Sequence, residues 1–130
     1  MAKIIVILIQ SINGSISIDV NDYFWGCKSA ANDANIIFDA ASQIITEDYP
    51  MKVLVGDESD DVYAIEAHAD NFRYIETLFF LDMVAKLVAY TVPVLDPGEH
   101  MLFEGFGDMT KCRCEGTKII GNVVRSVYSL

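Results

Sequence analysis

The 130-residue chain is poor in the residue types that define several protein classes. It has three cysteines, two histidines and one tryptophan, and nine lysines and arginines against 19 aspartates and glutamates. This acidic balance, a net charge of −10, argues against direct binding to nucleic acid, because phosphate contacts need clustered cations. The odd number of cysteines argues against a disulfide framework and favours reduced thiols in a cytoplasmic protein.

The sequence also gives little support for a protein stabilised by a bound metal or for one that spans a membrane. Cys112 and Cys114 would share one face of a strand, but no second ligand pair accompanies them, which argues against zinc. The acidic segment Asp57–Asp61 is not followed by the glycine that the sixth position of a calcium loop requires. Charged residues interrupt the long apolar stretch Tyr74–Leu95, so we expect no membrane span.

The apolar content of the chain is sufficient for one core. Hydrophobic residues make up 52% of the sequence, and its length predicts a single domain over the whole chain. The apolar run Lys3–Gln10 is rich in β-branched residues and predicts a central strand covered on both faces, not a signal peptide. We expect a turn at Ser11, Asn13 and Gly14 to follow, and then an extended segment over Ser15–Val20.

Apolar residues at helical spacing predict one long helix over Ser29–Glu47, with Ser29 as its N-cap and Pro50 beyond its end. The other face of this helix carries a polar stripe, which we interpret as solvent-exposed. Its members are Asn32, Asn35, Asp39 and Gln43. Strands are expected over Met51–Gly56 and over Asp61–Ala67.

The second half of the chain is predicted to hold one more helix and then mostly β structure. The expected elements are a helix capped by Asp70 or Asn71 and running through Phe79, a strand over about Ala85–Val94, a turn at Asp96–Gly98, a short element at Leu102–Gly105, and strands Lys111–Glu115 and Ile119–Tyr128 joined at Gly116. This order predicts an α/β fold with a mixed central β-sheet flanked by helices.

Several stretches resemble one enzyme family. The stretch IIVILIQSINGSIS resembles the family's opening strand and its Ser-x-Asp/Asn-Gly motif, and Trp25 with Ser29 and the helix after them resembles its substrate-side helix. The run FFLDMVAKLVAYTVPVLDPGEHMLFEGFGD resembles its proline-valine strand, glycine turn and Leu-Phe, and IIGNVVRSVYSL its closing strand. The chain thus resembles a dihydrofolate reductase-like fold, truncated in its central part, closest to the C-terminal reductase domain of the bifunctional deaminase-reductases of riboflavin biosynthesis.

The resemblance implies an NADPH-dependent oxidoreductase that acts on a pterin or a ribosylamino-pyrimidine. The substrate-side residues that it implies are Asn13, Trp25 and Ser29, and the cofactor-side residues are Gly14, Gly56 and Glu66. The alternative interpretation of the first three is structural, with Asn13 in a turn, Trp25 in the core and Ser29 as a helix cap.

One segment departs from the family pattern. Where the family has a glycine pair that lets backbone approach the cofactor, this chain has Glu66–Ala69, and a carboxylate there would repel a pyrophosphate. Glu66, His68 and Asp70 alternate, so in a strand they would share a face and could form an acid–base or metal cluster. Alternatively the strand ends near Ala67, His68 is an exposed loop residue and Asp70 caps the next helix.

These departures and the acidic charge define a second functional class. In it the chain is a non-catalytic acidic binding module, of an inhibitor or nucleic-acid-mimic type, that engages a basic protein partner. In either class we expect a homodimer, because the apolar strands Ala85–Val94 and Ile119–Tyr128 present more β surface than so short a sheet can cover.

Overall fold

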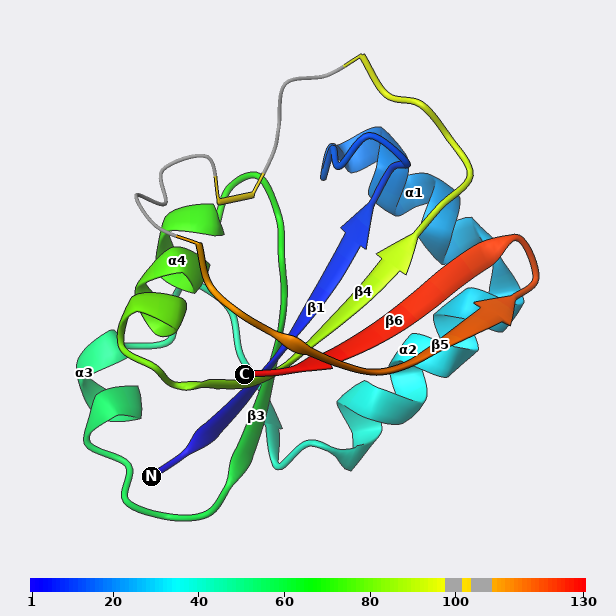
Figure 1. Cartoon of the computed structure of the whole chain (residues 1–130). Coiled ribbons are helices and arrows are strands. Elements are labelled where there is room, and N and C mark those ends of the chain that lie inside the picture. Colours follow the sequence, from blue (N-terminus) through cyan, green and yellow to red (C-terminus); the bar gives the residue numbers. More distant parts are fainter. Residues whose placement is uncertain (98–101, 104–108) are drawn as a thin grey trace.

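The computed structural model describes residues 1–97, 102–103 and 109–130 (Figure 1). Its strands form one six-stranded mixed sheet in the order β2-β3-β1-β4-β6-β5, which confirms the predicted fold class. The elements are β1 (Lys3–Gln10), α1 (Ile18–Gly26), α2 (Lys28–Ala40), β2 (Gln43–Ile44), α3 (Met51–Val55), β3 (Val62–Glu66), α4 (Phe72–Phe80), β4 (Val84–Thr91), β5 (Arg113–Ile120) and β6 (Val123–Ser129).

Strand β1 lies at the centre of the sheet, where the sequence predicts it. It pairs in parallel with β3 on one side and with β4 on the other, so its backbone is hydrogen-bonded along both edges. Its side chains alternate between two separate cores, with Ile4 and Val6 in one and Ile7 and Ile9 in the other. An unbroken apolar strand is therefore required here, because both faces of β1 are covered.

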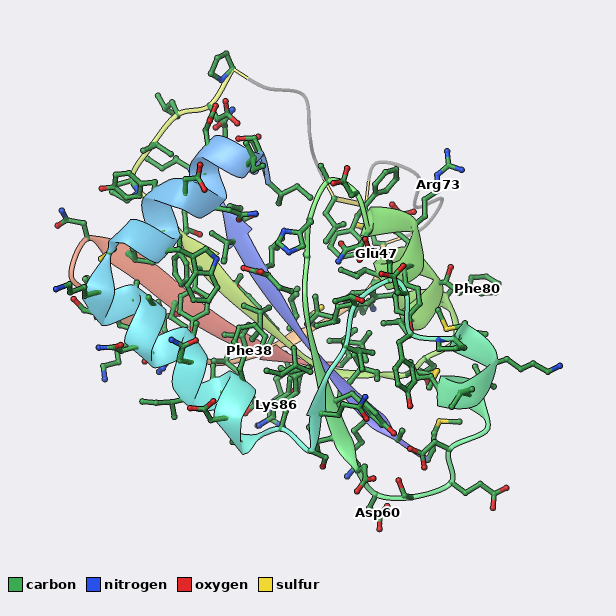
Figure 2. All side chains as sticks on the ribbon, turned by 180° about the vertical axis from the view of Figure 1, so that it is seen from behind. Phe38, Glu47, Asp60, Arg73, Phe80 and Lys86 are labelled. Atoms are coloured by element: carbon green, nitrogen blue, oxygen red, sulfur yellow. The ribbon has the colours of Figure 1, made fainter. Side chains whose placement is uncertain are left out.

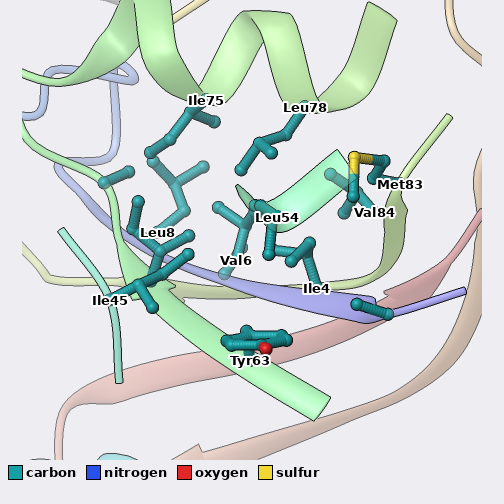
Figure 3. Packing of buried hydrophobic residues seen from close by; sticks show 14 of the residues in the cluster. Ile4, Val6, Leu8, Ile45, Leu54, Tyr63, Ile75, Leu78, Met83 and Val84 are labelled. Carbon is teal, nitrogen blue, oxygen red and sulfur yellow. The ribbon is translucent and has the colours of Figure 1, made fainter. Parts of the chain in front are cut away.

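Helices α3 and α4 cover one face of the sheet (Figure 1). In this core Leu54 from α3 and Ile75 and Leu78 from α4 are fully buried against Ile4 and Val6 of β1 (Figure 3). The last residue of α4, Phe80, is 87% exposed and points away from the sheet (Figure 2).

Helices α1 and α2 cover the opposite face, where Phe24, Ala30 and Ala34 pack against the sheet. A polar network lies beside this core. The carboxylate of Asp33 on α2 accepts hydrogen bonds at 2.7 Å from the hydroxyl of Tyr90 on β4 and at 2.8 and 2.9 Å from Nη1 of Arg125 on β6. This network ties a helix to two neighbouring strands. Burial, together with the hydrogen bond to Asp33, raises the pKa of the Tyr90 hydroxyl.

The expected extended segment Ser15–Val20 is wrong, because α1 begins at Ile18. Ser17 is the N-cap, with its hydroxyl accepting from the backbone N–H of Val20, and Asp19 lies in the first turn. Val20 and Phe24 are four residues apart and both buried, which is the spacing of one helix face.

The long helix predicted over Ser29–Glu47 is also wrong in its bounds. Helix α2 spans Lys28–Ala40 with Cys27 rather than Ser29 as its N-cap, and the chain then forms β2, which pairs in parallel with β3. The prediction that the polar stripe is exposed to solvent is confirmed for its residues on α2, where Asn32 and Asp39 are exposed.

The structure corrects two further predictions. The segment predicted as a strand over Met51–Gly56 is helix α3, which starts directly after Pro50. Gly116 lies inside β5 at a bulge, and the hairpin turn is formed instead by Gly121 and Asn122. Gly121 has a φ of 62°, a conformation that favours glycine in the first position of a two-residue hairpin loop.

Three of the remaining predicted elements are confirmed within a few residues, whereas the turn expected at Asp96–Gly98 extends beyond the described residues. Strands β3 and β4 and helix α4 occupy the expected segments, with Asn71 rather than Asp70 at the N-cap of α4. The element expected at Leu102–Gly105 falls largely outside the described residues. In the described part of the chain no helix is long and apolar enough to cross a bilayer.

The exposed β surface from which a homodimer was expected does not lie on the strands as predicted. Strand β4 is paired on both edges, whereas the edge strand β5 is exposed along almost its whole length. A bulge and the charged Lys118 on β5 are features that protect sheet edges against further pairing. The homodimer therefore stays a prediction.

We expect the substitution Asp33→Ala to lower the free energy of unfolding by about 2–3 kcal/mol, because it leaves the Arg125 guanidinium and the Tyr90 hydroxyl without their shared acceptor. Urea unfolding measures this change. The matched control, Asp39→Ala, removes an exposed carboxylate from the same helix and should stay within about 0.5 kcal/mol of the wild type. Equal effects of the two substitutions would contradict the role of the network.

Candidate functional site

A pocket of about 310 Å³ opens where the parallel strands β2 and β3 end. Carboxyl ends of neighbouring parallel strands meet at one edge of a sheet, which is where ligands bind in open α/β sheets. The segment after β2 contributes Thr46 and Glu47, and the segment that ends β3 contributes Glu66 and His68. Helices α1 and α2 form the opposite wall.

The helical wall of the pocket is aromatic. Trp25 near the end of α1 stacks on Phe38 of α2, with ring centroids 6.4 Å apart and an interplanar angle of 29°. The buried ring of Phe24 meets Trp25 edge-on at 5.1 Å and fixes its orientation from behind. Since Trp25 is 36% exposed, an aromatic surface is available to a ligand.

The carboxylate of Glu66 is held by two donors. Its Oε1 accepts a hydrogen bond from Nε1 of Trp25 at 2.8 Å, and its Oε2 lies 3.0 Å from Nε2 of His68. The Glu66 side chain is 19% exposed and that of His68 is 43% exposed. The hydrogen bond to Glu66 raises the pKa of His68, an effect opposed by burial and reinforced by the charges of Glu47 and Asp70.

Asn71, only 2% exposed, fixes the turn that carries these two groups. Its Oδ1 accepts from the backbone N–H of His68 at 2.7 Å, and its Nδ2 donates to the backbone carbonyl of Glu66 at 2.8 Å. The Asn71 side chain therefore replaces two backbone hydrogen bonds between the end of β3 and the start of α4. The sequence had predicted only a helix cap at Asn71, whereas its side chain also positions Glu66 and His68.

The charge of the pocket is negative. Its described lining holds the carboxylates of Asp39, Glu47 and Glu66 and the imidazole of His68, but no lysine or arginine. Such a site favours ligands that donate hydrogen bonds or carry positive charge. The phosphates of NADPH do not fit this lining, since each would face a carboxylate with no cation nearby. A volume near the lower end of the roughly 300–1,000 Å³ usual for ligand pockets also suits one ring system better than a dinucleotide.

The structure brings together two of the six residues that the sequence singled out. Trp25 and Glu66, expected on the substrate and cofactor sides, line the same pocket and share a hydrogen bond. Of the three alternating residues Glu66, His68 and Asp70, for which a cluster was one interpretation, Glu66 and His68 are in contact although β3 ends at Glu66. Asp70 affects His68 only through its charge. Among the described residues, no three potential metal ligands are grouped as an ion would require.

The other four residues lie outside this pocket. Asn13 is engaged with the backbone of Asp96, to which its Nδ2 donates at 2.7 Å and from which its Oδ1 accepts at 3.0 Å. Gly14, with a φ of 84°, belongs to the same turn. Ser29 lies in the first turn of α2 beside the β5–β6 hairpin, and Gly56 ends α3.

Sequence reasoning missed the contribution of the segment Ile44–Glu47 and the end of α2. It placed Ile44–Glu47 inside a helix, so these residues were not expected at a strand end. The polar stripe that it assigned to solvent contains Asn35 and Asp39, which line the pocket. A signal for α2 ending at Ala40 was not visible, because Ala41, Ile44 and Ile45 continue the helical spacing.

The sequence matches no protein-family model and resembles no curated protein significantly. Solved structures, however, share the fold, and the fold is that of the dihydrofolate reductase-like reductase domains. A protein from Shewanella sp. PV-4 assigned to riboflavin biosynthesis matches with a TM-score of 0.63 at 12% sequence identity, over 99% of this chain and 98% of that one.

Two other matches point to the same fold. RibD of Acinetobacter baumannii matches with a TM-score of 0.69 at 7% identity over 98% of this chain, which spans only 57% of the RibD chain. A pyrimidine reductase-like protein of Corynebacterium diphtheriae matches with a TM-score of 0.56 at 13% identity, over 98% of this chain and 91% of that one. At sequence identities this low, the structural likeness establishes the fold of this chain and nothing more.

We expect Asn71→Ala to lower the free energy of unfolding by about 2–3 kcal/mol, because it leaves the N–H of His68 and the carbonyl of Glu66 without partners. Asn71→Asp keeps the acceptor but sets a buried carboxylate oxygen against the carbonyl of Glu66, so it should cost at least as much. Chemical denaturation with the exposed control Asn32→Ala measures both changes. A cost below about 0.5 kcal/mol for either substitution of Asn71 would contradict the double role of the amide.

Proposed function

We propose that the chain is a reductase-fold protein that binds the ring of an aminopyrimidine or pterin in the pocket beside Trp25. The observation that carries this proposal is the carboxylate of Glu66, which is positioned by Trp25 and His68 at the edge of an aromatic wall. The likeness of the fold to that of a pyrimidine reductase-like protein supports the same class of ligand.

The aromatic wall suits the flat face of such a ring. Trp25 and Phe38 stack on each other from neighbouring helices and together line the pocket, so a planar heterocycle can pack against their rings. Because Phe24 supports Trp25 from behind, little side-chain freedom is lost when a ligand binds.

The carboxylates suit the edge of the ring. A ring N–H next to an exocyclic amine offers two parallel donors, and a carboxylate with spare lone pairs can accept both. Glu66 uses one oxygen for Trp25 and one for His68, which leaves further acceptor positions on each oxygen. Asp39 and Glu47 add negative charge that favours amino-substituted rings over anionic ligands.

Reductase activity on such a ring requires a hydride donor, which NADPH supplies in enzymes that use it. The described lining of the pocket does not suit its phosphates, so the cofactor would have to bind elsewhere on the chain. Calorimetric titration with NADPH decides between the two forms of the proposal. Binding at micromolar affinity supports a reductase, and no heat up to millimolar NADPH supports a ligand-binding protein without hydride transfer.

The proposed ring site predicts a strong effect of Glu66→Gln on ligand affinity. The substitution keeps the size of the side chain but removes the charge, and we expect pterin and diaminopyrimidine to bind roughly 10- to 100-fold more weakly. The fluorescence of Trp25, the single tryptophan, reports binding directly because Trp25 lines the pocket.

The control is Glu58→Gln, which removes an exposed carboxylate from the connection between α3 and β3 without touching the pocket. It should leave ligand affinity within about twofold of the wild type, since screening weakens distant surface charges. Equal affinities of wild type and Glu66→Gln, or no binding of either probe to the wild type, would refute the ring site.

A second candidate function is the non-catalytic acidic module that engages a basic protein. It is favoured by the exposed acids Glu58, Asp60 and Asp61, which lie together in one connection, and by the excess of 19 acids over nine lysines and arginines. If this function holds, the wild type should retain a lysine-rich peptide at low salt and release it as salt rises. The triple substitution of these acids by their amides should abolish retention, whereas Glu66→Gln should not.

A further inference from the structure

Asn21 of α1 contacts the only histidine that lines the described pocket. It is 7% exposed, and its Nδ2 lies 3.1 Å from Nδ1 of His68. In this orientation the amide donates to Nδ1, which requires a neutral ring whose proton is on Nε2 and points to Glu66. The amide oxygen, Oδ1, is buried and has no hydrogen-bond partner among the described residues.

The same amide can serve the charged ring. Rotation by half a turn about its last side-chain bond exchanges Oδ1 and Nδ2, so that Oδ1 faces Nδ1 of His68. An imidazolium donates from both nitrogens, to Glu66 at Nε2 and to Asn21 at Nδ1. The exchanged orientation gives the buried oxygen a partner and leaves Nδ2 at the unpartnered position, so its advantage is that a hydrogen bond from a charged donor is stronger than one between neutral groups.

The charged groups near His68 all favour the imidazolium. Glu66 approaches from the end of β3, Glu47 from the segment after β2, and Asp70 from the turn before α4. Helix α1 presents the uncharged amide of Asn21. Since these three charges are negative, they oppose loss of the proton from His68, whereas the uncharged amide of Asn21 can serve either form of the ring.

We propose that Asn21 is a positioning residue whose amide turns to follow the proton on His68, so that His68 is the proton-exchanging group of the pocket. The proton on His68 then sets how much negative charge Glu66 offers to a ligand. For this last step the inference rests on the proposed ring site. The behaviour of Asn21 and His68 in the free protein does not depend on that site.

The direction in which the pKa of His68 changes on substitution of Asn21, measured in the free protein, tests the inference. Ring signals of the two histidines in NMR titrations are assigned with His68→Gln, and the substitution Asn21→Leu removes the amide. If the amide turns and stabilises the imidazolium, Asn21→Leu lowers the pKa of His68 by about one unit, and Asn21→Asp raises it. If the amide keeps its present orientation and stabilises the neutral ring, Asn21→Leu raises the pKa instead.

Asn32→Leu, the same substitution at an exposed position of α2, should leave the pKa of His68 unchanged. In the wild type, the side-chain amide signals of Asn21 should shift with the same midpoint as His68. A raised or unchanged pKa in Asn21→Leu overturns the inference. Should that variant fail to fold, Asn21→Asp and the amide signals give the answer, and an unchanged pKa together with static amide signals overturns it.

A second measurement links the proton to the ligand. Calorimetric titration of diaminopyrimidine in two buffers of different ionisation enthalpy counts the protons exchanged on binding near the pKa of His68. The wild type should exchange a measurable fraction of one proton, and His68→Gln should exchange close to none. Absence of binding would refute the ring site alone, whereas binding with equal proton exchange in both proteins would refute the role of His68.

Discussion

The arrangement of the whole molecule depends on one constraint, which is that β1 must be covered on both faces and paired on both edges. Its backbone groups are satisfied by β3 and β4, and its alternating side chains require helices above and below the sheet. Covering both faces forces the chain to leave β1 through α1 and α2 on one side and to return through α3 and α4 on the other (Figure 1). The two connections also bring the ends of β2 and β3 to the same sheet edge, which is where the pocket lies.

The site follows from this arrangement through short polar contacts. The end of β3 points Glu66 toward the helical layer that holds Trp25, and Asn71 fixes the turn that directs His68 to the same place. An acidic pocket at the edge of a reductase-like sheet is unusual for a cofactor phosphate site, because anions at strand ends are normally met by backbone N–H groups at a helix N-terminus. Here the described lining offers carboxylates instead, so the ligand proposed for this pocket has the opposite polarity. The shared fold thus does not fix the ligand of this chain.

Secondary structure was predicted most reliably where an element is buried on two faces, because its sequence pattern then allows only one interpretation. Lys3–Gln10 is apolar throughout and could only be a central strand, and the mixed sheet follows from the order of the elements. Prediction failed where the spacing of apolar residues fits either a helix or a strand. Ile44 and Ile45 continue the spacing of α2, yet Ile44 pairs with β3. This pairing covers an edge of β3 that a longer helix would leave unpaired. The cap at Ser17 was a usable signal for α1, whereas nothing local distinguishes Met51–Val55 from a strand of the same composition.

The site was predictable only in part for a related reason. Trp25 and Glu66 were singled out by resemblance to a family, but the pairing between them depends on where β3 and α1 end in space, which no local pattern states. The alternation of Glu66 and His68 suggested a shared strand face, and the two do meet, although the contact is made across a turn held by Asn71. Asn21 gave no signal at all, because its importance comes from a single contact between α1 and the turn after β3. Residues whose role is to adjust another side chain are set by tertiary contacts, so the least predictable part of this protein is also the part that controls the charge of its pocket.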